Sequence, residues 1–228
     1  MNSDIANLRL YQLISPTLPI GSFTYSQGME WSVESDWINN RETLSEWLVS
    51  VLNDSLVWLE LPILLRLFDA CHNNDTNSFN HWSEQLLASR ESMELRQEEL
   101  NRARALLSVL NKLPDASSWT ELHEWGDALL NSQASSFALA AKHWGIDRRQ
   151  TLIAYAWSWL ENAVTVAVKL IPLGQSDGQT TLYHLSNSLP DAIDMAMSIG
   201  DDDIGASTPA LAIASSLHET QYTRLFRS

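Results

Sequence analysis

TLIAYAWSWLENAVTVAVKLI, residues 151–171, predicts a helix that is apolar on almost every side. Such a helix is either a membrane span or the buried centre of an all-helical domain. Its length suits a span, since roughly 20 apolar residues cross a bilayer. However, Glu161 and Asn162 lie at its middle, where a carboxylate in hydrocarbon is energetically costly. Thr151–Ile171 therefore predicts a buried central helix, and no membrane association is expected.

Residues on both sides of this stretch mark its ends. Asp147 precedes it and offers a side-chain acceptor of the kind that caps a helix N-terminus. Pro172 and Gly174 follow it, and both residue types stop helices. The helix is thus expected to begin shortly after Asp147 and to end before Pro172.

The rest of the chain carries helical signals and no convincing strand signal. Apolar residues recur at helical spacing in the segment that follows Asn40. The alanine-rich segment Gln133–Trp144 is closed by Gly145. No internal repeat or linker divides the chain. The sequence therefore predicts an all-α, single-domain bundle of about ten helices, residues 1–228, around the buried central helix.

Residues 77–112 predict one long helix or two stacked helices. A seven-residue repeat predicts a buried seam formed by Leu86, Met93, Leu100 and Leu107. Oppositely charged residues four apart predict ion pairs on the solvated face, namely Arg90 with Glu94 and Glu98 with Arg102. Pairs of this kind add little stability and do not identify a site.

Composition restricts the class of protein. The chain has 228 residues, 45% of them hydrophobic, which is enough apolar material for a sizeable core. Its formal net charge of −14 argues against a nucleic-acid partner, because phosphate binding needs a basic face. Cys71 is the single cysteine, so no internal disulfide can form and a reducing compartment is expected. The first residues include Asp4 and no apolar run, so we expect no signal peptide and a cytoplasmic location.

Motifs of catalysis and of cofactor binding are missing from the sequence. There is no GxxxxGK[ST] phosphate loop, no GxGxxG after a strand, no GxSxG elbow and no HExxH pair. By themselves the motifs therefore indicate a helical protein with no visible catalytic centre, and we expect that it binds no nucleotide of its own.

The last residues, HETQYTRLFRS (218–228), form a local oddity. No Lys or Arg occurs between Lys169 and Arg224, and two arginines then fall among Tyr222, Leu225 and Phe226. Tyr and Arg are the residue types that dominate binding hot spots. We expect an interaction tail at about residues 218–228 that is disordered or loosely held in the free protein.

Three motifs, in the same order, give the chain a family resemblance. They are LISPTLPIGSFTYSQGMEW (13–31), VAVKLIPLGQSDGQ (166–179) and SLHETQYTRLFRS (216–228), and the acidic stretch Ser89–Arg102 matches as well. Together they resemble the urease accessory protein UreF family over essentially the whole chain.

The resemblance implies an all-α, cytoplasmic protein, often a homodimer, that is not itself an enzyme. Members bridge UreD (also called UreH) to the GTPase UreG on or beside the urease apoprotein. The assembly delivers nickel to the urease active site, and the metal passes through the complex without being stably held. The resemblance thus implies a urease maturation factor that modulates GTP-dependent nickel insertion by contact with its partners.

The resemblance also assigns residues to each partner. Contact with the GTPase is implied for Tyr25, Ser26, Gln27, Gly28, Glu30, Lys169, Pro172, Gly174 and Gln175. Contact with UreD is implied for the tail residues His218, Glu219, Tyr222, Arg224, Leu225, Phe226, Arg227 and Ser228. Many relatives carry Arg where this chain has Lys169, which keeps the charge but loses a bidentate fork.

Two other classes of protein stay open at this point. A helical hydrolase or ligand-binding enzyme would bring Glu30, Lys169 and a histidine together in a core pocket. A metal-storage or metal-sensing bundle would place two or more His or carboxylate ligands on facing helices.

Overall fold

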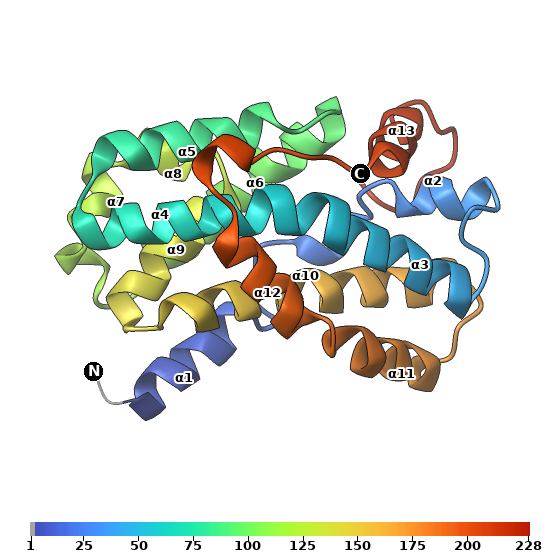
Figure 1. Ribbon diagram of the computed structural model, residues 1–228, viewed down its shortest axis with the longest axis horizontal. Coiled ribbons are helices and arrows are strands. Elements are labelled where there is room, and N and C mark those ends of the chain that lie inside the picture. Colours follow the sequence, from blue (N-terminus) through green and yellow to red (C-terminus); the bar gives the residue numbers. More distant parts are fainter. Residues whose placement is uncertain (1–2) are drawn as a thin grey trace.

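Helices account for the regular structure of the chain (Figure 1). The structure, a computed structural model, describes residues 3–228, and no strand occurs in that range. The α-helices are α1 (Ser3–Leu13), α2 (Met29–Glu34), α3 (Arg41–Val51), α4 (Leu61–Asn73), α5 (Thr76–Ala88), α6 (Met93–Leu110), α7 (Glu121–Glu124), α8 (Gly126–Leu129), α9 (Gln133–Trp144), α10 (Arg148–Leu170), α11 (Gln175–Ser186), α12 (Leu189–Ser198) and α13 (Pro209–His218). The other helical elements are the 3-10 helices η1 (Ser22–Thr24), η3 (Ala116–Ser118) and η4 (Asp201–Asp203) and the π-helix η2 (Leu52–Glu60). The prediction of an all-α single domain is confirmed.

Local signals in the sequence set several helix ends. Asn40 Oδ1 accepts the main-chain N–H groups two and three residues ahead, at 2.8 and 3.0 Å, and so caps α3. Asp147 Oδ1 accepts the N–H of Gln150 at 2.9 Å and caps α10. Gly145 ends α9 in the left-handed conformation, with φ 65°. These three ends lie where the sequence predicts them.

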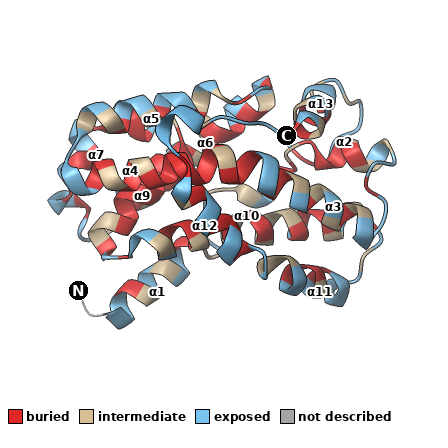
Figure 2. Ribbon diagram, viewed as in Figure 1, coloured by how far each residue is buried: buried red, intermediate tan, exposed pale blue. Residues whose placement is uncertain are grey.

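The predicted central helix is α10, which packs against α2, α3, α4, α11 and α12. Its first half is largely buried, whereas Glu161 and Asn162 are half-buried and Lys169 is exposed. Two other helices are more completely enclosed, namely α9, in which ten of the 12 residues are buried, and α4, in which Ile63 and Leu64 have 0% exposure (Figure 2). The core is therefore shared among α4, α9 and α10, of which the sequence signal found α10 as the centre.

Helices α3, η2 and α4 run on without a break as one 33-residue helix, Arg41–Asn73. This helix is long and apolar enough to cross a membrane, but 72% of its most apolar window is buried inside the protein, as in a core helix. Pro62 lacks the N–H that would bond the carbonyl of Trp58 four residues earlier. That carbonyl accepts the N–H of Gly205 at 3.0 Å instead, which ties the segment after η4 to the core.

Residues 77–112 form two helices, α5 and α6, and the connection between them corrects two expectations. Arg90 lies in the connection with 8% exposure and turns inward, so it does not pair with Glu94 on the solvated face. Met93 is 57% exposed, because the helix restarts there and the seven-residue repeat loses its register. Glu98 and Arg102 do pair, at 2.9 Å, but in a part-buried position.

Four side chains form what we call the core ion cluster: Glu60, Arg90, Glu99 and Tyr155. Arg90 Nη1 donates to Glu60 Oε1 at 2.8 Å, and its Nε donates to Glu99 Oε2 at 2.9 Å. Tyr155 donates its hydroxyl to Glu60 Oε2 at 3.2 Å. Burial would raise the pKa of Glu60, but Arg90, together with Arg102 and the hydroxyl of Tyr155, outweighs burial and holds that pKa below its ordinary value. The cluster links η2, α6 and α10 through satisfied charges.

Candidate partner-binding site

The structure brings the N-terminal motif and the tail together, although they lie at opposite ends of the sequence. The motif spans η1 and the start of α2, and the tail leaves α13 and passes beside it (Figure 1). Three carboxylates receive the tail: Glu30 from α2, and Glu94 and Glu98 from α6. We call this group the tail cradle.

Glu30 holds the main chain of the tail. Its side chain accepts the N–H of Leu225 at 2.5 Å and the N–H of Phe226 at 2.9 Å. Its Oε2 also faces Nε2 of His218 at 3.1 Å. Glu30 is 8% exposed, and a buried carboxylate is stable only when it is hydrogen-bonded or paired. The tail therefore supplies what this carboxylate needs in order to be buried.

Glu94, at the start of α6, holds the side chains of the tail. Its Oε2 faces Nδ1 of His218 at 2.6 Å, and its Oε1 accepts from Arg224 Nη1 at 2.6 Å. His218 is fully buried, and each of its two ring nitrogens faces a carboxylate oxygen. An imidazole donates from both nitrogens only in its protonated form. Glu219 Oε1 also accepts the N–H of Met93 at 2.8 Å, so a tail residue bonds the first turn of α6.

Glu98 holds the end of the tail. Its oxygens accept from the hydroxyl of Ser228 at 2.8 Å, from Gln27 Nε2 at 2.9 Å and from Arg102 Nη1 at 2.9 Å. Ser26 donates both its N–H and its hydroxyl to the main-chain oxygen of Ser228. Ser228 is accordingly only 1% exposed.

Gly28 lets the N-terminal motif approach α13 closely. It adopts φ +77°, which disfavours a side chain, and a Cβ added there would lie 2.7 Å from the main-chain nitrogen of Ser215. Ser215 precedes His218 on the same helix and forms a 2.6 Å hydrogen bond with Ser92, the N-cap of α6. The glycine thus sets the distance between α2 and the helix that leads into the tail.

The tail has an inner and an outer face. Phe226 is 6% exposed and packs inward, whereas Tyr222 and Leu225 are 103% and 67% exposed. Lys169 Nζ lies 5.8 Å from the ring centroids of both Phe226 and Phe23, so the middle motif reaches the tail through a cation–π contact. Tyr222 and Leu225 are therefore the large apolar tail side chains that are open to solvent.

The other predicted residues divide by exposure. Tyr25 and Ser26 are both buried, and Ser26 is bonded to Ser228 of the tail, so neither side chain is open to a partner in this structure. Pro172, Gly174 and Gln175 are exposed where α11 begins. Asp177 Oδ2 accepts the N–H of Gly174 at 3.3 Å, which fixes this turn. Within the middle motif, Lys169 is the residue that reaches the tail.

The expectation of a loosely held tail is wrong for this structure. The tail is bonded along its length, from His218 and Arg224 to Phe226 and Ser228. Its receiving carboxylates lie on α2 and α6, more than a hundred residues away in sequence, so the tail pattern alone could not reveal them. Glu94 and Glu98 do fall within the acidic stretch that matches the family, and this was the available signal.

The two alternative classes make geometric demands that can be compared with the site. Glu30 and His218 are in contact, as a hydrolase site would need, but both are buried and their polar atoms are occupied by Glu94 and by the tail main chain. For a metal-storage bundle, no group of three or more His, Cys, Asp or Glu placed to hold an ion occurs within residues 3–228.

Comparison with known proteins identifies a family for this chain. The UreF family model matches residues 38–186. A urease accessory protein UreF of Alcanivorax borkumensis is 58% identical over 225 residues, covering 98% of each chain. The UreF of Pseudomonas putida strain W619 is 49% identical over the full length of both chains. That of Alkalilimnicola ehrlichii is 40% identical, covering 100% of this chain and 98% of the relative.

Proposed function

Because the chain belongs to the UreF family of urease accessory proteins, we propose that it serves urease maturation by bridging UreD (UreH) and the GTPase UreG on the urease apoprotein. In this role it modulates GTP-dependent nickel insertion into the urease active site. Nickel is cargo of the complex, and this chain neither holds it stably nor uses a cofactor. It works in the cytoplasm, in agreement with the free thiol of Cys71, and as a homodimer within the complex.

The observation that carries the proposal is the pair of hydrogen bonds that the Glu30 carboxylate accepts from the main-chain N–H groups of Leu225 and Phe226. It joins the N-terminal motif to the tail and fixes which tail side chains face outward. Tyr222 and Leu225 then present an apolar surface to UreD, with Arg224 close by. Aromatic and Arg side chains of this kind are the usual centres of binding energy in interfaces.

The same geometry divides the residues for which the sequence motifs imply contact with the GTPase. Lys169, Pro172, Gly174 and Gln175 are exposed and can touch UreG directly. Ser26, Gln27, Gly28 and Glu30 support the interface from within, because they hold the tail and α13 in place, and Tyr25 is buried beside them in the sequence. Variants of the second group should therefore weaken both partner contacts, and variants of the first group only one.

The experiment is a pull-down of full-length variants with UreD and, separately, with UreG, each paired with a melting curve. Tyr222→Ala/Leu225→Ala should lose UreD binding and urease activation with an unchanged melting temperature, because both side chains are exposed. The matched control is Leu8→Ala/Tyr11→Ala, which removes an equally spaced and exposed Leu and Tyr from α1. Undiminished UreD binding by the tail variant would contradict the proposal.

A further inference from the structure

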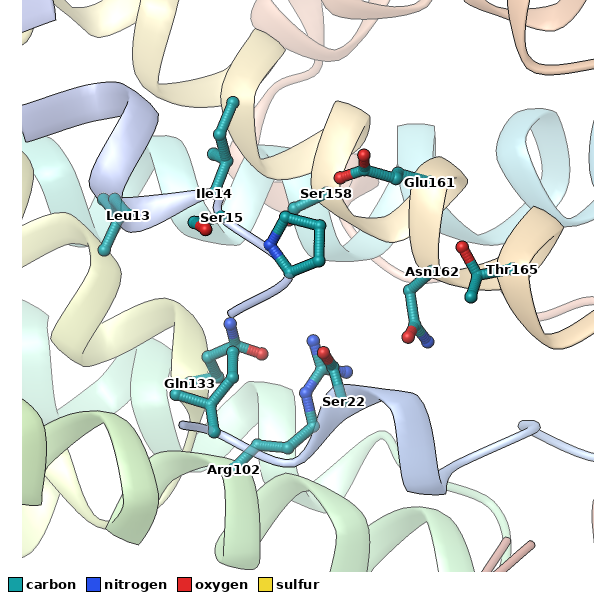
Figure 3. A pocket seen from close by; sticks show the side chains of 12 residues that line it. Leu13, Ile14, Ser15, Ser22, Arg102, Gln133, Ser158, Glu161, Asn162 and Thr165 are labelled. Atoms are coloured by element: carbon teal, nitrogen blue, oxygen red, sulfur yellow. The ribbon is translucent and has the colours of Figure 1, made fainter. Parts of the chain in front are cut away.

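A pocket lies apart from the tail cradle, where the segment between α1 and η1 crosses α10 (Figure 3). Its apolar side comes from that segment, including Ile14 and Pro16. Its polar side comes from α10, with Glu161 and Asn162, the two residues that interrupt the apolar central helix. The space open to a water-sized sphere is ≈ 50 Å³, and one such sphere needs roughly 10–15 Å³. The pocket therefore has room for a molecule of about four heavy atoms.

Two buried polar groups that line this pocket lack a partner within the described residues. Gln133 is 3% exposed and its Oε1 has no hydrogen-bond donor, and Nε of Arg102 has no acceptor. Figure 3 shows both side chains at the same pocket, from α9 and α6. A buried acceptor and a buried donor that both stay unpaired are costly, and native structures rarely keep them so. A ligand that offers one acceptor and one donor would satisfy both.

The charge of Arg102 favours an anion. Its Nη1 pairs with Glu98, but that carboxylate also accepts from Gln27 and Ser228 and is thus shared among three donors. The nearby carboxylates Glu60 and Glu99 are paired with Arg90. Glu161 faces the same pocket, and its carboxylate is a like charge that weakens the binding of an anion there.

We propose that this pocket binds a small oxyanion that carries its own hydroxyl group, of the size of bicarbonate. Arg102 donates to a charged oxygen of the ion, and Gln133 Oε1 accepts from its hydroxyl. Asn162, with one donor and one acceptor group, can pair with either end. This site is independent of the partner contacts proposed above, although Arg102 also touches the carboxylate that holds Ser228.

The test uses the full-length protein labelled with ¹⁵N and follows the Nε–H resonance of Arg102 at mildly alkaline pH. Arg102→Lys, which keeps the charge but removes this N–H, assigns the signal. Sodium bicarbonate is titrated at constant ionic strength, with sodium nitrate as a planar oxyanion without a hydroxyl. We expect a saturable shift with bicarbonate and about tenfold weaker binding of nitrate, because nitrate cannot donate to Gln133.

Three variants sharpen the test. Gln133→Met, which is apolar and of similar size, should weaken bicarbonate by about tenfold and leave nitrate unchanged. Glu161→Gln should tighten both ions, because it removes a like charge. Arg104→Gln, on the exposed side of the same helix, should change neither. If bicarbonate causes no saturable shift, or binds Gln133→Met as well as the native chain, the pocket holds only water and the proposal fails.

Discussion

The core ion cluster and the tail cradle both contain buried carboxylates, but the groups that bind these carboxylates differ between the two regions. In the core ion cluster, Glu60 and Glu99 are paired with one buried arginine that lies between two helices. In the tail cradle, Glu30 receives two main-chain N–H groups from a segment that belongs to no helix. The first arrangement fixes the fold. The second fixes the position of a surface segment, whose outward side chains are then defined.

The difference implies that charge removal in the core should cost stability, whereas changes at the cradle should mainly alter partner binding. Arg90→Met tests the first half and should have the largest effect. It leaves Glu60 and Glu99 buried without a cation, and breaking a buried pair in this way costs about 3–5 kcal/mol. Urea denaturation should show this loss.

The control for Arg90 is Arg148→Ala, which breaks an exposed pair with Asp69. Exposed pairs contribute about 0–1 kcal/mol. Equal losses in the two variants would mean that the core ion cluster has no special role in stability.

The second prediction concerns the contact between α2 and α13, on which the tail cradle depends. Gly28→Ala should destabilise the protein by about 2–4 kcal/mol, since it combines backbone strain with a clash against the main chain of Ser215. UreD binding should fall as well, because α13 leads directly into the tail.

Gly21→Ala is the matched control for Gly28. Gly21 has nearly the same φ, +73°, but an added Cβ would meet nothing closer than 3.9 Å. Its cost should be the backbone strain alone, about 1–2 kcal/mol, with UreD binding retained. A larger loss at Gly21 than at Gly28 would show that the close approach is unimportant.

How far the sequence predicts this arrangement depends on the range of each interaction. Asn40, Gly145 and Asp147 act within a few residues, and their helix ends are predictable from local pattern. The partners of Arg90 are Glu60 and Glu99, which packing between helices brings to it. The four-residue spacing in the sequence predicts Glu94 as the partner, and that prediction is wrong. The tail could be recognised as unusual, but Glu30 as its receiver could not be derived from the tail's own residues.

The third prediction separates the two regions by pH. The pKa of Glu60 is held below its ordinary value in the folded protein, so unfolding in acid takes up a proton there. Stability from this group is complete above the unfolded pKa, near 4.5, and is lost as pH falls toward the folded value.

Glu60→Gln should therefore reduce the steepness of the acid loss by up to about 1.4 kcal/mol per pH unit, measured by urea denaturation below that pH. UreD binding at neutral pH should be kept if the variant is folded, because Glu60 does not touch the tail. An acid loss as steep in Glu60→Gln as in the native chain would contradict a role for this carboxyl.

The smallest effect on stability is expected at Lys169. Its charge can serve the structure alone, or it can also contact UreG, and a variant separates these two roles. Its amine contacts Phe23 and Phe226 at an exposed position, and such a cation–π contact is worth about 0.5–1 kcal/mol. It also lies in the last turn of α10, where the helix dipole favours a cation by about 0.3–1 kcal/mol. Lys169→Ala should thus lower the melting temperature by only a few degrees.

Binding decides whether Lys169 is more than a structural charge. We expect Lys169→Ala to weaken UreG binding or urease activation, and Lys169→Arg to restore it, since the cation over the two rings is kept. Lys112→Ala is the control, because Lys112 is also exposed and follows the end of a helix, α6. Lys169→Ala could instead bind UreG normally and lose as much stability as Lys112→Ala. Lys169 would then only balance the dipole at the end of α10. Any contact of the middle motif with UreG would be left to Pro172, Gly174 and Gln175.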